Sequence, residues 1–152
     1  LNHVKPHGAL YNRAAWDEEV AQAVCSAVQQ ADGSLALYGL SGSIMEKAAA
    51  NHNLQFVHEV FADRTYQPDG SLTPRNAAHA LIEDTNTSLQ QVLSMVQHRS
   101  VKAITGETIS IKAETICIHG DGAHAVDFVK AIHQGLLDNH ITLKTHAKNE
   151  QR

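Results

Sequence analysis

The sequence has little cysteine and no long hydrophobic run, and both absences exclude classes of protein. Only 2 of the 152 residues are cysteine, Cys25 and Cys117, and each lies in an apolar pattern where an unpaired thiol acts as a small buried hydrophobe. No disulfide scaffold is therefore expected. The apolar runs are shorter than the roughly 18 residues that a bilayer-spanning helix needs, and the first residues do not resemble a signal peptide. These features predict a cytoplasmic protein without a membrane partner.

The sequence also lacks an excess of one charge and the short motifs of common binding sites. A net charge of -4 gives no general affinity for nucleic acid. The 11 histidines suggest metal binding, but HExxH, CxxC and a His pair at i, i+4 on an apolar helix face are absent, as are the Walker and GxGxxG motifs. Any metal would need ligands from separate strands. Most histidines, His58 among them, are expected at the surface or at helix ends.

What the sequence does contain is a regular alternation of strand-like and helix-like segments. In chain order we expect a strand ending at 7, a helix at 17–31, a strand at 34–40, a helix at 43–53 capped by Ser41 or Ser43, a strand at 54–62, a helix at 86–98, two extended pieces within 101–114, a strand at 115–120, a helix at 124–140 and a last strand at 141–145. This order predicts a single β/α domain over residues 1–152, with a mostly parallel sheet that is open or closed into a barrel.

Polar residues gather at the predicted carboxyl ends of strands, where such folds place their active sites. The first cluster is Lys5-Pro6-His7-Gly8. Lysine supplies a point charge for a carboxylate or phosphate, and histidine moves a proton or binds a ligand near neutral pH. An ordinary solvated strand end explains the same four residues equally well.

A second cluster follows the strand at 54–62. Asp63 and Arg64 leave this strand side by side, and Tyr66, Asp69 and Arg75 follow within one loop. Arginine with aspartates suits a site for a carboxylate or phosphoryl group. A loop held together by its own Asp/Arg pairs explains the pattern slightly better. The Pro-Asp-Gly at 68–70 favours a turn and a small hairpin.

The third cluster is His119-Gly120-Asp121-Gly122, between a strand and a helix. Asp121 can cap the helix, and the glycines leave backbone N–H groups available to an anion. Capping explains Asp121 but not His119, which is expected to point toward a barrel mouth or into the core. For the glycine-rich stretch at 39–43, a tight strand-to-helix turn is favoured over a phosphate cradle.

Three long motifs together carry more information than any of these clusters. VKPHGALYN, EVFADRTYQPDGSLTPR and ICIHGDGAHAVDF, in this order and with these gaps, resemble the LamB/YcsF family from His3 to about Leu143. The resemblance implies a parallel β/α barrel-like fold of the glycoside hydrolase and deacetylase type. It also implies ATP-dependent cleavage of 5-oxo-L-proline to L-glutamate, performed with partner subunits B and C.

The chain departs from the family in one respect. Family members carry an Asp-Leu-Asn-Ala-Asp type strand motif and a later His-Ala-Gly-Asp type motif, and neither occurs here. We therefore expect this chain to correspond to the C-terminal part of the family, an N-terminally truncated barrel portion. Such a portion has an exposed sheet edge, which favours homo-oligomers.

The family resemblance suggests roles for the three clusters. We expect catalytic roles for His7, Asp63 and His119, and binding of substrate or phosphate by a second set: Lys5, Arg64, Arg75, Gly120 and Asp121. ATP is expected from the resemblance, and a divalent cation is left open. The alternatives are a metal-dependent carbohydrate deacetylase on the same fold and a noncatalytic subunit.

Overall fold

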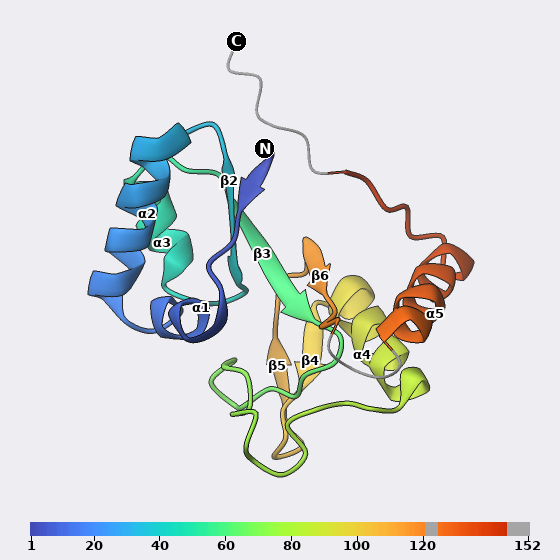
Figure 1. Ribbon diagram of the computed structural model, residues 1–152. Coiled ribbons are helices and arrows are strands. Elements are labelled where there is room, and N and C mark those ends of the chain that lie inside the picture. Colours follow the sequence, from blue (N-terminus) through green and yellow to red (C-terminus); the bar gives the residue numbers. More distant parts are fainter. Residues whose placement is uncertain (121–124, 146–152) are drawn as a thin grey trace. The chain divides into compact units, whose positions relative to one another are not determined.

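The computed structural model describes residues 1–120 and 125–145, which form two compact units (Figure 1). The first unit contains Leu1–Glu59 and the described residues after Leu143, and the second is Val60–Leu143. The boundary falls within a strand, so residues consecutive in the chain contribute to both units. Each unit carries one of the polar clusters considered below.

The first unit is a parallel β/α arrangement, as the alternating pattern predicts. Its elements are β1 (His3–Val4), α1 (Gly8–Ala14), α2 (Glu18–Asp32), β2 (Ala36–Leu40), α3 (Met45–Asn51) and β3 (Phe56–Phe61), whose last two residues belong to the second unit. β2 pairs in parallel with β1 on one side and with β3 on the other. The carboxyl ends of these three strands therefore point the same way.

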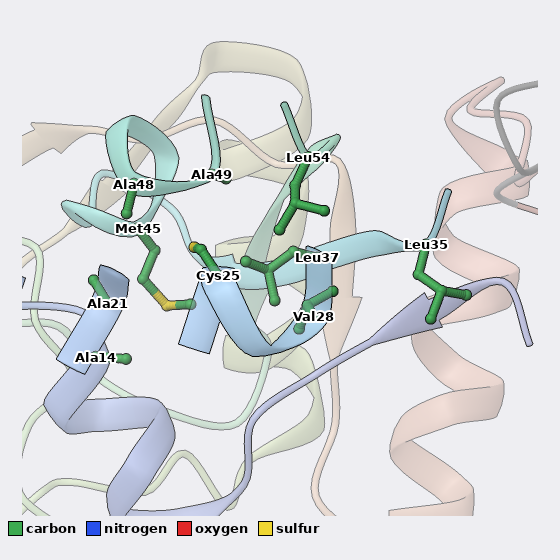
Figure 2. Close-up of a cluster of buried hydrophobic side chains, with 10 residues drawn as sticks. All are labelled: Ala14, Ala21, Cys25, Val28, Leu35, Leu37, Met45, Ala48, Ala49 and Leu54. Atoms are coloured by element: carbon green, nitrogen blue, oxygen red, sulfur yellow. The ribbon is translucent and has the colours of Figure 1, made fainter. Parts of the chain in front are cut away.

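The core of the first unit forms where α2 and α3 meet β2 (Figure 2). Leu37 and Met45 are fully buried there, and Leu54 joins them after α3 ends. Cys25 lies in the same cluster, and burial raises the pKa of its thiol to about 11. Both described cysteines are thiols, as expected.

The two helix starts in this unit differ. Asp17 caps α2, since its carboxylate accepts the backbone N–H of Val20 at 3.2 Å. The prediction that Ser41 or Ser43 caps α3 is wrong, because Ile44 occupies the cap position and makes no side-chain cap bond. A backbone turn takes the place of the hydroxyl: Gly42 has φ +78°, and the N–H of Ser43 donates to the carbonyl of Leu40. The tight strand-to-helix turn expected at 39–43 is confirmed.

The second unit combines helices with short strands. Its elements are α4 (Thr85–His98), β4 (Ser100–Lys102), β5 (Thr108–Ser110), β6 (Thr115–Cys117) and α5 (Ala125–Asp138). β4 and β5 form an antiparallel pair around Gly106. β6 lies beside the end of β3, where the N–H of Ala62 donates to the carbonyl of Cys117 at 3.0 Å. Gly135 of α5 lets Leu89 of α4 approach closely, so the two helices pack together.

The expected strand at 141–145 is wrong, because those residues have no regular secondary structure. The chain instead closes α5 with a C-terminal cap. The N–H of Ile141 donates to the carbonyl of Leu136, the N–H of His140 donates to Leu137, and His140 has φ +59°. This is the Schellman pattern, in which an apolar residue after the left-handed position packs back on the helix. Ile141 packs against Leu136 in this way. The apolar side chain that suggested a strand therefore belongs to the helix cap.

Candidate functional site

In the second unit, the structure brings together Asp63, which follows β3, and His119, which follows β6. Nδ1 of His119 lies 3.0 Å from Oδ1 and 2.9 Å from Oδ2 of Asp63. The backbone N–H of His119 also donates to Oδ2 at 2.9 Å. One carboxylate thus fixes both the main chain and the ring of the histidine. Because Asp63 takes Nδ1, Nε2 is the ring nitrogen left for chemistry with a ligand.

Phe61 orients the imidazole further. Its ring stacks on that of His119, with centroids 5.5 Å apart and an interplanar angle of 23°. The phenol of Tyr66 receives the backbone N–H of Phe61 at 2.8 Å, and the side-chain amide of Gln91 donates to the carbonyl of Phe61 at 3.0 Å. The side chains of His119 and Asp63 keep 26% and 14% of their surface exposed. The pair is therefore rigidly held yet reachable by solvent.

The loop after Asp63 is held largely by its own polar contacts. Arg64 is buried and donates through Nη2 to the carbonyl of Thr73, and Tyr66 forms an antiparallel bridge with Leu72. The small hairpin expected around Pro-Asp-Gly is thus present. Burial, and then the nearby charge of Arg75, lower the pKa of Arg64. Two guanidinium groups close enough to repel each other would both gain from an anion.

In the first unit, Lys5 lies just beyond β1 and pairs with Glu59 of β3. Nζ of Lys5 is 2.8 Å from Oε1 of Glu59 and 5.4 Å from the centroid of the Tyr11 ring. His3 stacks on Tyr38 at 4.1 Å between centroids, one strand over. Of the cluster expected at the end of the first strand, Lys5 therefore makes an ionic contact with a buried acid and lies near an aromatic ring.

The other predicted site residues occupy less constrained positions. His7 is exposed at the N-cap position of α1 and makes no side-chain cap bond there. Arg75 and Gly120 are exposed. Asp121 lies outside the described residues. Asp69 organises its own turn by accepting the N–H and hydroxyl of Ser71, and these hydrogen bonds, the hydroxyl one first, lower its pKa.

Sequence reasoning missed Glu59 and misplaced His58. Both lie in β3 and are buried, at 3% and 5% exposure. His58 is not at the surface: it packs edge-on against Phe56, and its Nε2 lies 3.3 Å from Oε1 of Glu46 on α3. The signal was available in FVHEVF, since a strand buried on both faces has no solvated side to accommodate a charged residue.

Within the described ranges, no group of three or more His, Cys, Asp or Glu side chains is arranged to hold a metal ion. Asp63 and His119 supply two such side chains from different strands. None of the helices in the described part of the chain is both long and apolar enough to cross a membrane.

Comparison with known proteins agrees with this architecture. A solved structure, the lactam utilization protein of Thermus thermophilus, superposes on 95% of this chain with a TM-score of 0.86 at 35% sequence identity. The chain covers 57% of that structure. The fold is therefore of the parallel β/α barrel-like class that the sequence predicts.

The sequence comparisons name the family. The LamB/YcsF family model matches residues 1–151, so the chain belongs to the LamB/YcsF family. It is 53% identical over 144 residues to the 5-oxoprolinase A subunit of Tolumonas auensis, and 46% identical over 152 residues to that of Geobacillus thermodenitrificans. The chain spans 57% and 59% of the length of these two relatives.

Proposed function

We propose that the protein is component A of an ATP-dependent 5-oxoprolinase, which opens 5-oxo-L-proline to L-glutamate in the cytoplasm together with subunits B and C. The observation that carries the proposal is the Asp63–His119 pair, held at the ends of two strands in a chain similar to subunits of that name. The relatives are named as A subunits, which supports the involvement of further subunits.

The chemistry explains the need for such a pair. Opening a lactam is amide hydrolysis, and ATP would supply the phosphoryl group that activates the amide oxygen. A proton must still reach the ring nitrogen as the C–N bond breaks, and one must leave the attacking water. A histidine with Nδ1 held by a carboxylate and Nε2 turned to a ligand suits these transfers. We assign this role to His119, with Asp63 orienting it.

The remaining roles follow from charge. Lys5 and Arg64 would bind anionic substrate or phosphate, and the proximity of Arg75 to Arg64 supports an anion there. His7 would act in proton transfer or hold a cation, and Gly120 and Asp121 would contribute backbone N–H groups and a carboxylate. A divalent cation accompanying ATP would be held by a carboxylate such as that of Asp121.

The test is glutamate release from 5-oxoproline by the full-length protein mixed with its B and C partners, with ATP and each component omitted in turn. Release that needs ATP and this protein supports the proposal. No release, beside partners shown to be active with another A subunit, contradicts it. Metal-dependent release of acetate from an acetylated sugar would then identify a deacetylase, and stable complexes without turnover would identify a noncatalytic subunit.

A further inference from the structure

Glu59 occupies a position that is costly for a carboxylate. It is 3% exposed within β3, and in the part of the chain that the structure describes its Oε2 is buried without a hydrogen-bond partner. Desolvating an ion costs several kcal/mol, and a buried ion pair is often no more stable than apolar residues of similar size. Stability therefore does not explain why a glutamate occupies this position. Its contact with Lys5 points to a functional role instead.

Lys5 is the more accessible partner of this pair. The Lys5 side chain is 24% exposed, and the Glu59 side chain is 4% exposed. Lys5 lies just beyond the carboxyl end of β1. Folds of this class bind their ligands at that end of the strands. A lysine side chain has many rotamers and loses entropy when a ligand orders it. Glu59 on one side and the Tyr11 ring on the other restrict the ammonium group before any ligand arrives.

We propose that Glu59 is a positioning residue that aims the Lys5 ammonium at an anionic oxygen of a reactant. This inference rests on the proposed function and deepens it. The oxygen belongs either to the carboxylate of the cyclic amide or to a phosphate of the nucleotide, since both present the same charge to a lysine. Glu59 contacts the Lys5 ammonium through Oε1 and acts on the reactant through Lys5.

The first experiment uses the full-length protein with its partner subunits and the substitution Glu59→Gln. Glutamine keeps the volume and one acceptor oxygen but removes the charge. We expect the KM of one reactant to rise about tenfold or more, the scale of a charge-assisted hydrogen bond. The melting temperature is measured alongside, because a lysine that loses its partner can lower stability as well as affinity. If the cyclic amide is the reactant whose KM rises, the oxygen is that of its carboxylate, and if ATP is, the oxygen is that of a phosphate.

Glu46→Gln is the matched control. Like Glu59, Glu46 is a glutamate of the first unit that contacts a basic side chain, in this case that of His58. We expect its two KM values to match those of the wild type. The second variant, Lys5→Met with Glu59→Gln, removes both charges together and leaves no unpaired ion in the strand. It should raise the KM of the same reactant as Glu59→Gln does.

Two results overturn the inference while leaving the proposed function intact. In one, the wild type is active and the Glu59→Gln variant has unchanged KM values for both reactants. In the other, the single and double variants affect different reactants. A wild type that releases no glutamate with active partners contradicts the proposed function, and this inference with it.

Discussion

The two compact units each contain a histidine–carboxylate pair, and the pairs are built differently. His119 and Asp63 follow two strands, and the carboxylate binds both the ring and the backbone N–H of the histidine. His58 lies inside β3 with its Nε2 3.3 Å from Oε1 of Glu46, and the Glu46 side chain is 59% exposed. The same two chemical groups thus form a fixed, reachable site in one unit and a packing contact in the other. The two pairs differ in position: Asp63 and His119 follow strands, whereas His58 lies inside β3 and Glu46 lies on α3.

The largest expected difference between the two pairs is in activity. Asp63→Asn keeps the shape of the side chain but removes the charge that fixes the His119 tautomer. We expect kcat/KM for ATP-dependent glutamate release to fall about 100-fold or more, the scale of a general acid–base contribution. Glu46→Gln should stay within about twofold of the wild type, since the Glu46 side chain is exposed and an exposed charge contributes little.

Asp69→Asn is the matched control for Asp63→Asn, because Asp69 lies in the same loop and organises its own turn through Ser71. If Asp63→Asn and Asp69→Asn lower kcat/KM equally, Asp63 supports the loop and not the reaction.

The second prediction concerns stability and tests the packing of the hydrophobic core in the first unit. Leu37→Ala empties a fully buried position of the first unit and should lower the free energy of unfolding by about 2–5 kcal/mol. Denaturant unfolding measures this. Below its melting temperature, the variant should keep the KM values of the wild type. A shift in KM without a loss of stability would show that the core of the first unit acts directly on the ligand.

A smaller effect is expected where the aromatic ring orients His119. Phe61→Leu keeps an apolar side chain in β3 but removes the stacked ring. Aromatic pairs contribute about 0.5–1.5 kcal/mol beyond their buried area. We therefore expect kcat to fall by about two- to tenfold, measured at saturating reactants. An unchanged kcat would mean that Asp63 alone orients the ring.

The smallest effect is a pH-dependent one at the start of α4. Asp84 accepts the hydroxyl and the N–H of Thr87, and these bonds, the hydroxyl one first, lower its pKa below the usual 3.8. A carboxyl group with a lowered pKa in the folded state stabilises the fold above the unfolded pKa, and this is lost as the pH falls through the folded value. Asp84→Ala should lower the melting temperature at neutral pH. The difference from the wild type should shrink below about pH 4, and a difference that grows there would contradict the assignment.

Local patterns in the sequence predicted most of the fold. Acidic and apolar spacing predicted α2, and the apolar run at 54–62 predicted β3. Asp17, expected as the first residue of that helix, is its N-cap. Failures came where backbone geometry replaced side-chain chemistry. A turn at Gly42 made the serine caps unnecessary, and the cap of α5 used Ile141 in place of a strand. Neither the turn at Gly42 nor the cap of α5 can be recognised from the spacing of apolar residues.

The candidate site was predictable in part for a related reason. Asp63 and His119 stand 56 positions apart in the chain, and parallel topology brings strand ends together. That rule named both residues but not their contact. Glu59 was missed because it lies inside an apolar strand and not at its end. Its partner, Lys5, follows another strand, so no local spacing connects the two.

The most direct test of the central claim is kcat/KM for ATP-dependent glutamate release by full-length protein carrying His119→Asn, assayed beside the wild type and His58→Asn with the same B and C subunits. We expect a loss of about 100-fold or more for His119→Asn. His58→Asn should lose activity only in proportion to the fraction that unfolds. Activity near that of the wild type in His119→Asn would contradict the assignment of proton transfer to the strand-end pair.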